Sequence, residues 1–162
     1  MKKFSSISVF IALVIASTAS ASVERQIGDL RVTDGKTNKT IVLTKDTIAK
    51  LPTTTITTST AWTGRDKFTG ISFKDVLIKA GVKGKTVRVQ ALNDYWVDIP
   101  MTDIENYNII LANKRNDVEL RVRNFGPYFV IYPLDEHYEE LNKPIFYSRF
   151  VWQVEHLTVD PK

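Results

Sequence analysis

The alternation of hydrophobic and polar positions predicts many short strands. Runs that alternate, or that are rich in β-branched residues, recur along most of the chain and are separated by turn residues. Asp34-Gly35 and Asn93-Asp94 are typical of the tight turns between paired strands. The predicted strands are residues 28–33, 40–44, 53–60, 87–92, 95–99, 109–112, 118–122, 128–132 and 150–159.

Helical spacing of apolar residues predicts only a few helices, all of them short. The clearest begins after Ser72, whose hydroxyl is suited to cap the first turn, and ends at Gly81. Thr102 and Glu105 have the spacing of a capping box and predict a helix up to Tyr107. One or two helical turns are also predicted over residues 45–51 and 136–141.

The order of these elements indicates the fold class. Many short strands with a few short helices, in no regular β-α-β succession, predict an α+β fold. We expect a single domain with mixed β-sheets.

Residues 1–21 have the three-part layout of a secretory signal peptide. A lysine pair precedes an apolar run over residues 7–16, which is too short to span a bilayer comfortably. Ala19 and Ala21 place small residues at the −3 and −1 positions of a cleavage site. We therefore expect cleavage after Ala21 and a mature domain of residues 22–162, soluble and, in a Gram-negative cell, periplasmic. An uncleaved anchor is the alternative.

The composition excludes several kinds of chemistry. The chain has 162 residues, with 22 Lys+Arg, 18 Asp+Glu and no cysteine. Without cysteine there is no disulfide, no cysteine-type zinc or iron–sulfur site and no thiol nucleophile. Loss of the two leader lysines lowers the formal charge from +4 to +2. Because no run of five or more basic residues occurs, we expect no nucleic-acid partner.

An ordered series of segments spans residues 28–159. The series is a Thr-rich strand leading into Ala61-Trp62-Thr63-Gly64, then Phe68 to Leu77 with Ala80-Gly81, Ala91 to Tyr95, Ile99-Pro100, Ile110 to Ala112, Phe125 to Pro127, Ile131 to Pro133, and Val151 to Val154. Together these segments resemble the molybdopterin-binding domain of sulfite-oxidase-type oxidoreductases. The resemblance implies a mixed α+β fold with a pocket for a pyranopterin-dithiolene.

The chain departs from the active members of this family at the metal ligand. In those members a cysteine thiolate ligates molybdenum, close to where Thr58 or Ser59 stands here. A hydroxyl loses its proton at far higher cost than a thiol, so it is a much poorer ligand for a soft metal site.

Three further departures agree with the first. Active members usually carry an arginine four residues before the proline that is Pro133 here, and this chain has Phe129. The Gly-rich turn that often follows is replaced by Leu134 and Asp135. The leader lacks the paired arginines of the export route for folded, cofactor-loaded proteins. We therefore expect the fold without molybdenum, and no cofactor.

The resemblance also indicates a pocket. Tyr95 matches a tyrosine that lines the substrate pocket of active relatives and is the candidate catalytic residue, the alternative being a hairpin tyrosine that packs on the sheet. Trp62, Trp96 and Trp152 are candidates for a cleft that binds an aromatic or apolar ligand, or for core positions. The predicted pocket or cofactor residues are Thr58, Ser59, Trp62, Asp94, Tyr95 and Phe129.

Other polar groups carry weaker predictions. His137 and Glu140 would share a helix face and could ligate a metal, although a solvated acidic face is the simpler interpretation, and no metal site is predicted. Arg121, Arg123 and Arg149 are candidates for a positive pocket rim.

Three functions remain open from the sequence. The leading hypothesis is a module that binds a small molecule, or that senses one and docks onto a membrane-bound signalling protein. The alternative is a molybdopterin-dependent oxidoreductase with a non-cysteine metal environment. A structural subunit of a larger periplasmic complex is the third.

Overall fold

The computed structural model describes residues 26–161 as one domain built on two five-stranded sheets. The predicted signal peptide and its cleavage site lie outside the described residues. No helix between residues 26 and 161 combines the length and apolar character needed to cross a membrane.

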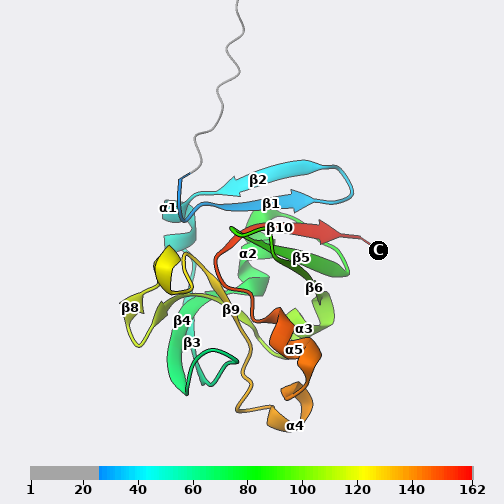
Figure 1. Cartoon of the computed structure of the whole chain (residues 1–162). Coiled ribbons are helices and arrows are strands. Elements are labelled where there is room, and N and C mark those ends of the chain that lie inside the picture. Colours follow the sequence, from blue (N-terminus) through cyan, green and yellow to red (C-terminus); the bar gives the residue numbers. More distant parts are fainter. Residues whose placement is uncertain (1–25, 162) are drawn as a thin grey trace, which may run out of the picture.

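The first sheet is mixed and contains both ends of the described chain (Figure 1). Its order is β2 (Lys39–Leu43), β1 (Leu30–Asp34), β10 (Val154–Asp160), β5 (Thr86–Ala91) and β6 (Trp96–Pro100). Strands β1 and β10 run parallel, with Arg31 opposite His156, and the other neighbours are antiparallel.

The second sheet is antiparallel throughout. Its order is β3 (Thr53–Thr58), β4 (Asp66–Ser72), β7 (Ile110–Arg115) and β8 (Val118–Glu119), while β9 (Phe129–Ile131) also pairs with β7. The β4–β7 register shifts beside Gly70, where a Cβ atom would lie 2.1 Å from the carbonyl oxygen of Leu111. Only glycine allows the two backbones to approach this closely.

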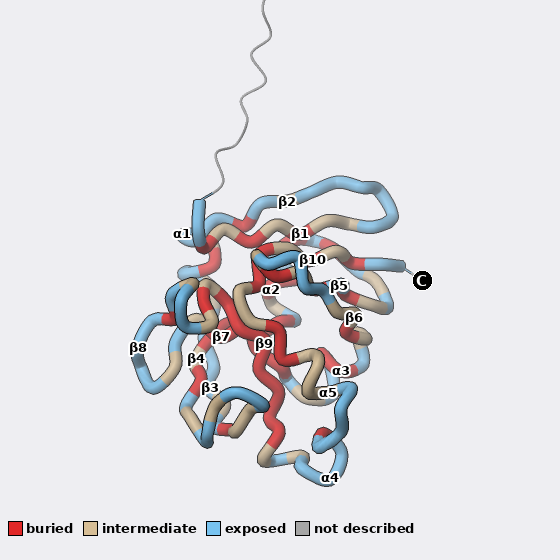
Figure 2. The backbone as a smooth tube through the Cα atoms, in the orientation of Figure 1, coloured by how far each residue is buried: buried red, intermediate tan, exposed pale blue. Residues whose placement is uncertain are grey.

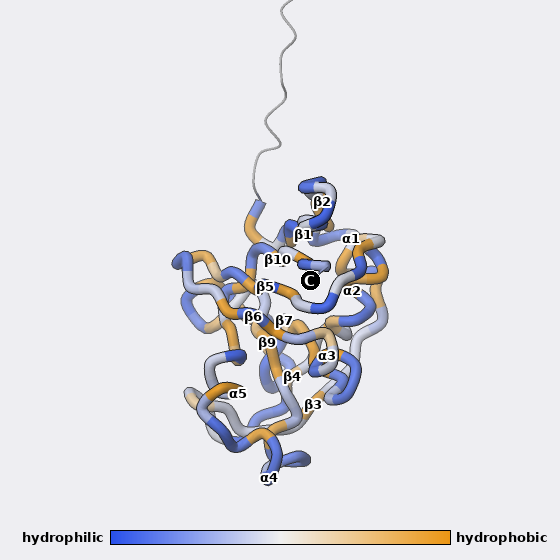
Figure 3. The backbone as a smooth tube through the Cα atoms, turned by 90° about the vertical axis from the view of Figure 1, so that its right-hand side faces the viewer, coloured by the Kyte–Doolittle hydropathy of each residue, from blue (hydrophilic) through white to orange (hydrophobic). Residues whose placement is uncertain are grey.

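Strand β9 crosses the centre of the molecule and is buried along its whole length (Figure 2). Every apolar residue from Tyr128 to Leu134 belongs to the buried core. Hydrophilic segments gather at the two ends of the molecule, at β2 and at α4 (Tyr138–Leu141) (Figure 3). This core strand contacts the segment before β10 (Val154–Asp160), because Phe129 forms a β-bridge with Trp152 and the Val130 amide donates to the Val151 carbonyl.

The helices are short, as predicted. They are α1 (Lys45–Ala49), α2 (Phe73–Ala80), α3 (Met101–Asn106), α4, α5 (Pro144–Arg149) and a 3-10 turn, η1 (Val122–Asn124). The predicted caps of α2 are confirmed, since the Ser72 hydroxyl accepts a hydrogen bond from the Asp75 amide and Gly81 adopts a left-handed φ of 70°.

The α+β single-domain class is confirmed, and several local predictions are wrong. Strand β4 and helix α5 were not predicted. Helix α3 begins at Met101 without a side-chain cap, so the capping box at Thr102 does not form. The last strand begins at Val154 rather than at residue 150. Beyond Glu119 the predicted strand 118–122 gives way to the η1 turn.

Candidate functional site

A cavity of about 430 Å³ lies between the β5–β6 turn, helix α5 and the loop that follows β3. Five of its lining side chains are aromatic and none is charged. The lining residues are Ala61, Trp62, Ala91, Asn93, Tyr95, Tyr147, Ser148, Phe150, Val151 and Trp152.

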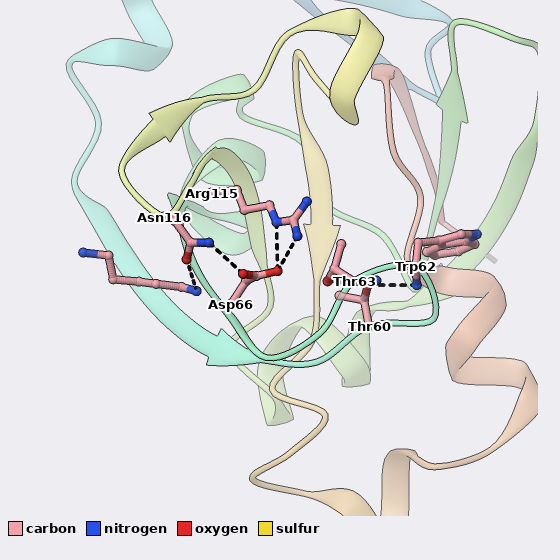
Figure 4. A network of polar contacts seen from close by, with 7 residues as sticks. Thr60, Trp62, Thr63, Asp66, Arg115 and Asn116 are labelled. Carbon is pink, nitrogen blue, oxygen red and sulfur yellow. Dashed lines mark hydrogen bonds and ion pairs between the residues drawn. The ribbon is translucent and has the colours of Figure 1, made fainter.

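The loop that carries Trp62 is held by its own threonines. The Thr60 hydroxyl accepts hydrogen bonds from the amides of Trp62 (3.2 Å) and Thr63 (3.1 Å), and it also bonds the Thr63 hydroxyl (2.9 Å). Such side-chain-to-backbone bonds fix a tight turn. Trp62 extends from this turn toward α5 (Figure 4).

An ion pair at the start of β4 anchors the other end of the loop (Figure 4). Asp66 accepts a hydrogen bond from the Asn116 amide group at 2.7 Å and pairs with the Arg115 guanidinium at 2.6 Å. These contacts, the Asn116 bond foremost, hold the pKa of Asp66 below its usual range.

The β5–β6 turn positions Tyr95 at the mouth of the cavity. The Asn93 side-chain oxygen accepts a hydrogen bond from the Tyr95 amide (3.2 Å), and Asp94 takes a left-handed φ of 64° between them. The Tyr95 hydroxyl then donates to the carbonyl oxygen of Ser148 (2.9 Å), which joins the turn to α5. The Asp94 side chain is exposed beside Gln90 and does not line the cavity.

A buried ion pair between Arg149 and Asp103 joins helix α5 to helix α3. Arg149 Nη1 donates to Asp103 Oδ2 at 2.7 Å, and the Tyr132 hydroxyl donates to the same oxygen at 3.0 Å. Burial first, and the Asp103 charge second, raise the pKa of Tyr132 well above its usual range, so the phenol stays protonated and donates. Arg149 therefore holds the helix that closes the cavity.

The predicted positive rim is wrong for this cavity. Arg149 points into the ion pair with Asp103, and neither Arg121 nor Arg123 lines the cavity. Arg121 instead lines a second cavity, of about 370 Å³, together with Lys45 and Glu119.

Thr58 and Ser59 do not line the cavity, and both are hydrogen-bonded to Asp135. The Ser59 hydroxyl donates to one oxygen of the Asp135 carboxylate, and the Ser59 amide donates to the other at 3.2 Å. The hydroxyl of Thr58, which is fully buried, accepts from the Asp135 amide (3.0 Å) and donates to the Ser59 carbonyl (3.3 Å). Both hydroxyls are thus used within the protein.

Phe129 also lies in the core rather than in the pocket lining. Its ring is fully buried, stacks on Phe125 with centroids 5.3 Å apart, and meets the edge of Phe68 at 5.8 Å. Trp62 packs against the same ring at 6.3 Å. Phe129 therefore supports the floor beneath Trp62. Of the predicted pocket residues, Trp62 and Tyr95 line the cavity.

The described residues contain no cluster of three or more side chains suited to hold a metal ion. His137 packs its ring against Tyr107, with centroids 5.3 Å apart, and Glu140 accepts a hydrogen bond from the Tyr107 hydroxyl at 2.9 Å. That bond raises the pKa of Tyr107. His137 precedes α4 instead of sharing a helix face with Glu140, so the metal-ligating geometry considered for this pair does not form.

The sequence did not predict the side of the cavity formed by α5, nor the contact of Asp135 with Thr58 and Ser59. The one local signal for α5 was Pro144, since proline is favoured in the first turn of a helix. Asp135 lay 76 residues from Ser59 and had no local signal at all.

Comparisons with known proteins agree with this architecture. A family model described as oxidoreductase molybdopterin binding domain matches residues 21–135. Among solved structures, the sulfane dehydrogenase SoxCD from Paracoccus pantotrophus is similar, with a TM-score of 0.62 and 20% sequence identity. The alignment covers 83% of this chain but only 38% of that one, so the likeness is one of fold. A comparison with curated proteins gave no match.

Proposed function

We propose that this chain, which belongs to the oxidoreductase molybdopterin binding domain family, is a periplasmic small-molecule-binding module that works without molybdenum. The cavity that carries Trp62 and Tyr95 is its binding site. Pockets of this size, with apolar walls and a few polar groups, are typical of sites for small molecules.

The engagement of Ser59 by Asp135 is the observation that carries the proposal. At the position where the family resemblance places a thiolate, the structure has a hydroxyl that already donates to a carboxylate. Binding a metal would require this hydroxyl to lose its proton and its partner, beside a negative charge. The residues present therefore do not fit a molybdenum centre.

The neighbouring residues agree with this interpretation. Thr58 is fully buried and its hydroxyl both accepts and donates within the protein, so it offers no free ligand. Where the family resemblance places an arginine, Phe129 has a ring stacked on Phe125 in the core. No cysteine stands anywhere in the 162 residues to replace these groups.

The cellular role follows from the leader and the pocket together. A leader of the general secretory type delivers an unfolded chain to the periplasm, where the domain folds and binds its small molecule. A membrane-bound signalling protein is the partner that would read the bound state. Helix α5 and the β5–β6 turn, joined through Tyr95 and Ser148, are the elements that a bound molecule would touch.

Elemental and pterin analysis tests the proposal. The full chain, expressed with its own leader in a Gram-negative host that makes molybdopterin, is recovered from the periplasmic fraction. A cysteine-containing member of the family, purified from the same host, is the positive control. We expect molybdenum far below one atom per chain and no pterin fluorescence.

Stoichiometric molybdenum and pterin would overturn the proposal and support a molybdopterin-dependent oxidoreductase with a non-cysteine metal environment. In that case Thr58→Ala or Ser59→Ala should abolish a measurable oxidation or reduction. Recovery of the protein from the cytoplasm alone would overturn the periplasmic part.

A further inference from the structure

The walls of the cavity favour a flat aromatic ligand. Trp62 is 49% exposed and presents its indole at the mouth, while its other contact, with the Phe129 ring, lies at 6.3 Å. Trp152 is fixed by an edge-on contact with Phe125 at 6.1 Å. Rings held in this way are prepared to stack on an aromatic face, and they lose little conformational freedom on binding.

The charge around the cavity favours an uncharged ligand. No lining residue carries a charge. The cations on the described elements that form the walls are each paired with a carboxylate: Arg65 with Asp135, Arg88 with Asp98, and Arg149 with Asp103. A charged ligand would lose its hydration without gaining a partner ion, which is costly.

At the β5–β6 edge of the cavity, Asn93 offers a donor and Tyr95 offers an acceptor. Asn93 uses its side-chain oxygen to accept from the Tyr95 amide, so its side-chain NH₂ group remains to donate. The Tyr95 hydroxyl donates its proton to the Ser148 carbonyl, so its oxygen remains to accept. A carbonyl beside an N–H group is the simplest ligand edge that satisfies both.

We propose that this cavity binds an uncharged, fused-ring aromatic molecule with a lactam edge, in which a carbonyl lies beside a ring N–H. This inference rests on the proposed function, because it names the ligand class of the same site. The cavity volume of about 430 Å³ accommodates such a bicyclic compound. Half of the lining residues, Tyr147 to Trp152, lie beyond the residues that the family model matches.

Four bicyclic probes separate the parts of the proposal, with binding to the full mature protein measured by isothermal titration calorimetry. They are 2-quinolone, N-methyl-2-quinolone, which lacks the donor, decahydroquinolin-2-one, which lacks the aromatic face, and quinoline-2-carboxylate, which carries a charge. We expect 2-quinolone to bind most tightly. Loss of one hydrogen bond should weaken binding about 3- to 10-fold, and loss of ring stacking by a similar factor. The carboxylate should bind at least about 10-fold more weakly.

Two tryptophans form a matched pair of variants. Trp62→Ala should weaken 2-quinolone binding about 10-fold, and Trp62→Phe should restore most of the affinity. Trp96, which is 53% exposed but lies outside the cavity with Arg88 stacked on it, is the control, and Trp96→Ala should leave binding unchanged. Asn93→Asp preserves the oxygen that accepts from Tyr95 and removes the donor, so it should weaken 2-quinolone about 3- to 10-fold.

Three outcomes would overturn the ligand class. They are binding of quinoline-2-carboxylate as tight as that of 2-quinolone, equal effects of the Trp62 and Trp96 variants, and no binding by any probe. Molybdenum and pterin analysis of the same preparation separates the two proposals. A metal-free protein that fails to bind the probes refutes the ligand class alone, whereas a molybdenum-loaded protein refutes the proposed function.

Discussion

Replacing Asp135 by alanine tests whether the Ser59 hydroxyl is engaged in solution. The substitution removes the acceptor of two hydrogen bonds, from the Ser59 hydroxyl and the Ser59 amide. A hydrogen bond to a charged group contributes about 1.5–3 kcal/mol when buried. The Asp135 side chain is 22% exposed, so water replaces part of the loss. We expect the variant to be less stable by about 2–3 kcal/mol.

Chemical denaturation with urea measures this change directly, and a thermal melt should show a decrease of about 5–10 °C for a domain of this size. Asp135→Asn is the conservative variant, because the asparagine side-chain oxygen can still accept a hydrogen bond from the backbone amide of Ser59. This variant should lose only about 1 kcal/mol of stability. Arg65→Ala removes the exposed partner of the same carboxylate and should change stability by less than about 0.5 kcal/mol.

A double-mutant cycle with Ser59→Ala isolates the pair. We expect a coupling energy of about 1–2 kcal/mol, since the two residues are in direct contact. A loss below about 0.5 kcal/mol in Asp135→Ala, together with no coupling, would show that the Ser59 hydroxyl is free. The main ground for a domain without molybdenum would then be removed.

Three further predictions concern the framework around the cavity. Arg149→Met strands the Asp103 carboxylate in the core and should cost about 3–5 kcal/mol by urea denaturation, whereas adding Asp103→Leu to it should recover part of the loss. Gly81→Ala forces a side chain into a left-handed φ of 70° and should lower the free energy of unfolding by about 1–2 kcal/mol. The control is Gly64→Ala, where the added methyl group points into open space and should change stability by less than about 0.5 kcal/mol. Equal effects of the two substitutions would contradict this explanation. The pKa of Asp66 is lower in the folded state than its ordinary value of 3.8. The ionised Asp66 carboxylate therefore stabilises the folded state above pH 3.8, and this stabilisation is lost as the pH falls through the pKa that Asp66 has in the folded protein. Asp66→Asn should therefore lower the free energy of unfolding above pH 3.8 and make that free energy fall less steeply as the pH is lowered below 3.8. Urea denaturation at a series of pH values on both sides of pH 3.8 would measure both effects.

Local signals in the sequence were enough for the elements whose ends are determined by adjacent residues. Helix α2 has a serine cap at one end and a left-handed glycine at the other, and both were read correctly. The β5–β6 hairpin was equally clear, because Asn93-Asp94 stands between two alternating runs. The order of segments indicated the family, since their succession is more specific than any one of them.

Elements that depend on distant partners were not predictable in this way. Strand β4 lost its alternation at Gly70, where the backbone approaches β7 and the register shifts. Helix α5 has only six residues and is held by Arg149, whose partner Asp103 lies 46 residues away. A pairing of this kind leaves no periodic pattern near either residue, because it is a property of the folded chain.

The same reason explains the partial prediction of the pocket. Tyr95 and Trp62 stand in short motifs that the resemblance could locate, and both line the cavity. Thr58, Ser59 and Phe129 were expected in the pocket from their positions in the resemblance, but position alone did not show that their side chains are used by Asp135 and by the aromatic core. Asp94 was expected in the pocket, yet its left-handed backbone turns it to solvent.

The parallel pairing of β1 with β10 determines when the domain can finish folding. Arg31 lies opposite His156, so the first strand waits for a partner that is synthesised 125 residues later. A chain that emerges from the ribosome amino terminus first therefore lacks the central strand of its first sheet until Val154–Asp160 has emerged. Contacts of such long sequence separation are slow to form, so we expect the β1–β10 pairing to form late in folding. The first sheet therefore becomes complete only after the residues at both ends of the described domain have been synthesised.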